Sequence, residues 1–175
     1  MTDHAGRIRA AAAAFKAANH TLIADLDALD EATATRPAAD GGWSAAQIAW
    51  HVAETNRLLA AMLAGELPGP RAAPGFVEDA DVFSRVPARV ESRIPEIQPP
   101  AAITRQEAVT RLRASEAPTV LAIESLTAER AGGYTLRMPF GILNLYQCAE
   151  FIGAHAGRHR RQVQRCLGAG EASAR

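Results

Sequence analysis

Apolar residues recur at helical spacing along the first part of the chain. From about Gly6 to Ala34 they follow one another at steps of three, four or seven, with charged residues between them. This pattern predicts an amphipathic helix of about seven turns. The helix should end before Arg36-Pro37, because the residue before a proline is disfavoured in helical geometry. The apolar positions are Ile8, Ala12, Phe15, Leu22, Leu26 and Leu29.

A second helix is predicted from Ser44 to about Gly65. Ser44 is followed three residues later by Gln47, which is the arrangement of a capping box. Apolar residues then continue at helical spacing to the glycine. They are Ile48, Val52, Leu58, Leu59, Met62 and Leu63.

The segment from Glu66 to Ile103 has little periodicity and contains seven of the ten prolines. So long a stretch without regular structure is uncommon inside a compact domain, and it is often functional or a long crossover. It leaves room for irregular turns or one short helix around Glu78 to Val90.

Two more helices are predicted in the C-terminal half. Thr104 and Glu107 form a second capping box and open a third helix, which Pro118 should kink or split. The segment YTLRMPFGILN suggests a short strand pair. Asn144 then caps a last helix that runs to about Gly168.

Four amphipathic helices with their longest connection between the second and the third predict an all-α four-helix bundle. The connection is long enough to let these two helices run in the same direction. We expect one domain over residues 1–168 and a flexible C-terminal tail over 169–175.

Three histidines carry the candidate chemistry. His155 and His159 stand four residues apart on the last helix and therefore project from one face. His51 lies on an apolar face of the second helix. A single histidine there would more often be a core residue bonded to a carbonyl. Three imidazoles that meet in a core need partners for several nitrogens, which favours a transition-metal site with a position left open.

Two segments that contain these histidines resemble the signature regions of the DinB-like superfamily of bacterial four-helix-bundle metalloproteins. They are GGWSAAQIAWHVAETNRLL and MPFGILNLYQCAEFIGAHAGRHRRQVQ. The residues that fit the family pattern are Trp43, Ser44 and His51 in the first, and Pro139, Gly141, His155, His159 and Gln162 in the second. One departure is Met138, which stands where many relatives have a histidine that is not one of the three ligands.

The resemblance implies that His51, His155 and His159 bind a divalent metal ion, with zinc or nickel expected. It also implies a metal-dependent transferase that uses a low-molecular-weight thiol and acts on a small-molecule substrate. A position left open on the ion is equally compatible with a hydrolase. The alternative is a non-catalytic metal-binding module in stress response or sensing. No catalytic residue and no organic cofactor site is assigned from the sequence.

Charge and cysteine content restrict the partners. Basic and acidic residues balance at 19 each, so neither nucleic acid nor a membrane is an expected partner, despite several arginines on the last helix. Cys148 and Cys166 lie too far apart on one helix for a disulfide, and the N-terminus lacks a signal-peptide core. These features suggest a cytoplasmic protein. The alanine-rich segment Ala10–Ala14 permits close helix approach, and DinB-like relatives are commonly dimers, so we expect a symmetric homodimer.

Four polar or thiol side chains near the predicted ligands have more ordinary interpretations. Glu54 and Glu150 could orient a ligand, although solvated helix residues are the commoner case. Gln162 is either a partner of His159 or a surface residue. Cys148 is expected in the core, about 10 Å from His155 along the helix axis and too far to share its ion.

Overall fold

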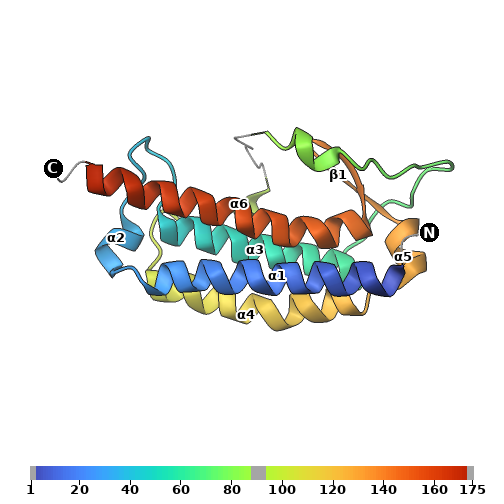
Figure 1. Ribbon diagram of the computed structural model, residues 1–175, viewed down its shortest axis with the longest axis horizontal. Helices are drawn as coiled ribbons and strands as arrows, with labels where there is room; N and C mark the ends of the chain where they lie inside the picture. Colours follow the sequence, from blue (N-terminus) through green and yellow to red (C-terminus); the bar gives the residue numbers. More distant parts are fainter. Residues whose placement is uncertain (1–2, 88–93, 173–175) are drawn as a thin grey trace.

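A computed structural model describes residues 3–87 and 94–172 of the protein. Four long helices lie side by side along the length of the molecule (Figure 1). This arrangement confirms the predicted all-α four-helix bundle. The helices are α1 (His4–Asp27), α3 (Ala45–Ala64), α4 (Arg105–Glu124) and α6 (Leu145–Ala172).

Helices α3 and α4 run in the same direction, and α1 and α6 run opposite to them (Figure 1). The tightest pairings are α3 with α4 and α1 with α6, while α3 also packs against α6. The crossover that follows α3 makes the parallel pairing possible, as predicted. It contains two 3₁₀ helices, η1 (Val82–Arg85) and η2 (Pro95–Ile97). The first lies within Glu78 to Val90, where the sequence leaves room for one short helix. Residues 88–90 of this range lie outside the described residues.

Both predicted capping boxes are present. Ser44 Oγ accepts a hydrogen bond from the Gln47 backbone N–H at 3.2 Å, and Gln47 Oε1 accepts one from the Ser44 N–H at 3.0 Å. Thr104 and Glu107 form the same reciprocal pair at the start of α4. These bonds satisfy N–H groups that a helix start leaves without partners, so they define where α3 and α4 begin.

The first predicted helix is wrong in its C-terminal part. Helix α1 ends at Asp27, and a separate helix α2 spans Glu31–Thr35. The reason is Asp30, whose backbone is extended and whose carboxylate accepts a hydrogen bond from the Thr33 N–H at 2.7 Å. An N-cap of this kind starts a new helix within a pattern that reads as one.

The C-terminal half agrees with the sequence pattern in part. Pro118 does not split α4. A helix that was not predicted, α5 (Ala128–Gly133), follows α4 and is capped by Thr127. The strand pair is confirmed, because β1 (Thr135–Met138) and β2 (Gly141–Asn144) pair antiparallel.

The last helix begins as predicted and continues beyond its expected end. Asn144 Oδ1 accepts from the Gln147 N–H at 2.9 Å, which confirms this cap. Helix α6 runs on to Ala172, four residues past Gly168. Residues 173–175 of the expected tail lie outside the described residues.

Ion pairs and hydrogen bonds hold the crossover against the bundle. Arg7 on α1 bonds to both Glu78 of the crossover and Glu150 of α6. Hydrogen bonds from Arg7 lower the pKa of Glu78. Gln147 adds a bond from its side-chain amide to the Asp79 carbonyl at 2.7 Å. The crossover is therefore attached to α1 and α6, and Glu150 is an ion-pair partner and not simply a solvated residue.

No helix within residues 3–87 and 94–172 is both long and apolar enough to cross a membrane. In the alanine-rich part of α1, Ala11 and Ala12 are buried, whereas Ala10, Ala13 and Ala14 are exposed. Helix α6 approaches the same part of α1 closely at Gly153. A Cβ atom at Gly153 would lie 3.0 Å from the Phe15 nitrogen and 3.2 Å from the Ala14 carbonyl carbon. The homodimer inferred from the alanine-rich segment stays a prediction.

We expect Gly153→Ala to destabilise the protein relative to Gly157→Ala by about 1–3 kcal/mol. Both substitutions gain the same helix propensity on α6, so their difference reports the close approach of the helices. An added Cβ at Gly157 meets nothing within 4 Å. Urea unfolding of the two variants measures the difference. Equal stabilities would show that the α1–α6 contact is not limited by Gly153.

Candidate metal centre

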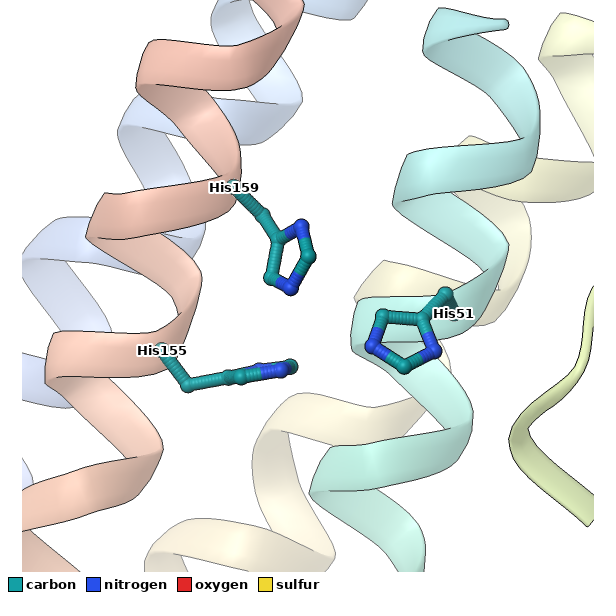
Figure 2. A group of neighbouring side chains, drawn as sticks. All are labelled: His51, His155 and His159. Atoms are coloured by element: carbon teal, nitrogen blue, oxygen red, sulfur yellow. The ribbon is translucent and has the colours of Figure 1, made fainter. Parts of the chain in front are cut away.

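Two neighbouring helices bring the three predicted histidines together. His51 lies two turns into α3, and His155 and His159 lie one turn apart on α6. Figure 2 shows the three rings pointing toward one another between these helices. One potential ligand atom from each ring lies within 4.8 Å of the others. The predicted proximity is therefore confirmed, whereas metal binding itself stays a prediction.

The rings pack closely and at an angle to one another. The centroid distance is 4.4 Å between His155 and His159, 4.9 Å between His51 and His159, and 5.3 Å between His51 and His155. Trp43 packs against His51 at 4.9 Å, and Phe151 packs against His155 at 5.3 Å. Aromatic side chains thus form part of the wall around the three imidazoles.

Hydrogen bonds orient two of the rings. The Nδ1 atom of His51 lies 2.7 Å from the Ile97 carbonyl oxygen, to which it must donate. The Nδ1 atom of His159 lies 3.0 Å from Gln162 Oε1, which accepts in the same way. Both bonds leave Nε2 as the nitrogen with a free lone pair. Fixing the tautomer in this way is the usual role of the outer hydrogen-bond partner of a metal-binding histidine. Of the two interpretations of Gln162, the partner of His159 is the correct one.

The third ring differs from the other two. His155 Nδ1 is buried and has no hydrogen-bond partner among the described residues. It is one of several buried side-chain atoms in this condition. Such atoms are rare in folded proteins unless water or an ion satisfies them.

Burial keeps the three imidazoles neutral. His51 is 5% exposed and His155 8%, whereas His159 is partly buried. Desolvation lowers the pKa of His51, and it lowers the pKa of His159 to about 3 with a further contribution from His51. The pKa of His155 falls well below its ordinary value, first through burial and then through repulsion by the other two rings. Neutral imidazole is the form that binds metal ions.

The crossover contacts both helices that carry the cluster. Besides the Ile97 carbonyl, the Pro87 carbonyl accepts a hydrogen bond from the Arg158 guanidinium at 2.7 Å. Arg158 lies on α6 between the two histidines in sequence, so the crossover contacts both helices that carry the site. The sequence analysis expected a lone histidine here to bond to a carbonyl, and His51 does so. The sequence could not indicate that Ile97 supplies this carbonyl, because a backbone carbonyl has no residue signature.

Other candidate residues lie outside the cluster. Glu54 is 7% exposed and bonds to Arg57 and Arg111 at 2.9 and 2.8 Å, so its interpretation as a solvated residue is wrong. The position of Glu54 in the sequence does not reveal that Arg111, on the neighbouring helix α4, pairs with it. Cys148 is 2% exposed within the apolar core, as expected, and burial raises the pKa of its thiol to about 12.

The remaining histidines and Met138 are also apart from the site. His4 bonds to the Tyr146 hydroxyl and His20 to Glu116. Met138, on β1, packs against the apolar core.

The fold and the cluster together define a class: an all-α four-helix bundle whose core holds three histidines able to bind a metal ion. The family model of the DinB superfamily matches residues 14–163, a range that includes all three histidines. The protein belongs to the DinB superfamily, which confirms the resemblance found in its sequence. Comparison with curated proteins and with solved structures finds no match.

Proposed function

We propose that His51, His155 and His159 bind one divalent transition-metal ion, zinc or nickel, and that the loaded protein catalyses transfer of a low-molecular-weight thiol or a hydrolysis. The observation that carries the proposal is the convergence of three neutral imidazole nitrogens within 4.8 Å. Imidazole suits both of these ions, and neutral ligands leave the full charge of the ion available.

The donor set fits such an ion. Ile97 and Gln162 engage the Nδ1 atoms of His51 and His159, so the Nε2 atoms of both rings are available as ligands. Metal–nitrogen bonds of about 2.0–2.1 Å in a tetrahedral site require nitrogens roughly 3.3 Å apart. The rings would therefore close by up to about 1.5 Å from the present separation, a distance within reach of side-chain rotation.

Three protein ligands leave a fourth position for water or substrate, which is typical of catalytic sites. When bound, the ion would supply Lewis acidity to a coordinated water or thiol. His159 is less buried than the other two histidines, so a small molecule would approach on its side. Trp43 beside His51 would offer an apolar contact to that molecule.

The alternative is a metal-binding module without turnover, acting in stress response or sensing. The deep burial of His51 and His155 and the attachment of the crossover favour it, because a closed site restricts substrate access. The two functions differ in a measurable property, which is turnover by protein that has been loaded with metal.

His155→Ala should abolish stoichiometric binding of zinc and nickel, because the remaining two imidazoles form only part of the site. His4→Ala is the matched control, since His4 bonds to Tyr146 away from the cluster. Isothermal titration calorimetry and elemental analysis measure the stoichiometry. Undiminished binding by His155→Ala would refute the assignment of the ligands.

Gln162→Ala should weaken metal affinity about tenfold, because ligand histidines depend on outer partners for their orientation. Gln164→Ala is the control on the same helix, since Gln164 bonds to Asp25 and not to a histidine. Competition with a chelator of known affinity measures both variants. The hydrogen bond to His159 would have no role in binding if the two affinities were equal.

The catalytic proposal is tested by screening metal-loaded protein for conjugation of thiols to electrophiles and for hydrolysis. We expect turnover that disappears on chelation, returns with zinc or nickel, and is lost in His159→Ala. Turnover that survives both chelation and the substitution would place the chemistry elsewhere. Full metal loading without turnover in these screens would support the module instead.

A further inference from the structure

A layer of polar side chains crosses the bundle and divides its core into two apolar clusters. On α1, for example, Phe15 belongs to one cluster and Leu22 to the other, and Asn19 lies between them. The same alternation occurs on each of the other three long helices. The polar layer consists of Asn19, Thr55, Asn56, Ser115, Thr119 and His155.

These side chains are deeply buried, yet several of their polar atoms lack partners. Asn19, Asn56 and Thr119 are fully buried at 0% exposure, and Thr55 and His155 are 7% and 8% exposed. Five atoms of the layer have no hydrogen-bond partner within residues 3–87 and 94–172. They are Asn19 Oδ1, Thr55 Oγ1, Asn56 Oδ1, Thr119 Oγ1 and His155 Nδ1.

The hydrogen bonds that are present show what kind of partner is missing. Asn19 donates its amide N–H to Glu116 at 2.9 Å, and Asn56 donates to Ser115 at 3.3 Å. Ser115 in turn donates its hydroxyl proton to the Leu112 carbonyl at 2.8 Å. The two asparagine Oδ1 atoms are acceptors only, so they require a molecule that donates.

The same bonds attach both asparagines to one turn of α4. They reach α4 at the successive residues Ser115 and Glu116. Thr119 is one turn further on α4, on the same side of the helix. Asn19 and Asn56 thus approach one turn of α4 from α1 and α3.

We propose that the polar layer is an internal hydration site. Water donates two hydrogen bonds and accepts others, and internal water in proteins typically makes about three. Water in the layer would donate to the asparagine Oδ1 atoms and accept from the Thr119 hydroxyl. A further molecule would bond to Thr55 on α3 and to His155 on α6, two helices that pack against each other.

The hydration site extends the polar contacts of the candidate metal centre to the opposite face of the bundle. Glu116 accepts from Asn19 with one carboxylate oxygen, and its other oxygen accepts from His20 Nε2 at 2.8 Å. The His20 side chain is 63% exposed, beside the groove between α1 and α4. With the proposed water in place, polar groups would lead from His155 through the core to the surface at His20.

Thr119→Val tests the site, because valine keeps the shape of threonine and removes only its hydroxyl. If water bonds to the hydroxyl, the substitution leaves that water with one partner fewer and lowers Tm by about 2–4 °C. If the hydroxyl is dry and unpaired, the substitution removes a buried polar group without compensation and Tm rises. Thr110→Val is the control, an exposed threonine of the same helix. An unchanged or raised Tm for Thr119→Val relative to this control would overturn the proposal.

Direct detection of the water uses metal-free protein, so the result does not depend on the proposed function. Oxygen-17 relaxation dispersion counts long-lived internal water molecules, and a crystal structure at atomic resolution locates them. We expect water at the asparagine Oδ1 atoms in the unmodified protein, and one long-lived molecule fewer in Asn56→Leu. A dry layer in the crystal structure would overturn the proposal whatever the stability measurements show.

Discussion

The antiparallel packing of α3 against α6 is the contact on which the candidate site depends. One turn of α3 presents His51 to two successive turns of α6, which present His155 and His159 (Figure 2). A rotation of either helix would separate the rings, so their register must be held from outside the site. Bonds from Gln47 of α3 and Gln147 of α6 to carbonyls of the crossover contribute to this, and Gly153 lets α1 approach α6 as far as backbone contact.

The cost of the site lies in its burial. Three imidazoles without charge and with few partners are expensive to place in an apolar core, where an unpaired polar atom loses its hydration. Two of the rings recover one hydrogen bond each, from Ile97 and Gln162, and His155 recovers none from the described protein. The fold therefore retains a polar arrangement that apolar residues would replace at lower cost, which argues for a function that needs it.

The parts of the structure that the sequence predicted well are those specified by neighbouring residues. Ser44 with Gln47 and Thr104 with Glu107 are local pairs, and both occur as predicted. Histidines four residues apart also lie on one face of any helix, so two of the three histidines of the site follow from spacing alone. The third histidine depended on the apolar pattern around His51 and on the resemblance to a known family.

The parts that could not be predicted depend on contacts between distant segments or on competing local signals. Glu54 has the spacing of a solvated residue, and only the neighbouring helix supplies the Arg111 that pairs with it. Asp30 lies within a regular apolar pattern, and its capping bond interrupts the helix there.

The crossover shows how an irregular segment can build a specific site. Several of its backbone carbonyls, among them those of Asp79, Pro87, Ile97 and Pro100, accept hydrogen bonds from side chains of α3 and α6. Because the backbone makes these contacts, they depend on where the chain passes and not on which side chains it carries. A segment rich in prolines suits this role, since proline restricts the path of the chain and still offers its carbonyl. The crossover thereby fixes the tautomer of His51 from outside the bundle. If the three histidines hold an ion, the affinity for that ion would depend on the position of the crossover.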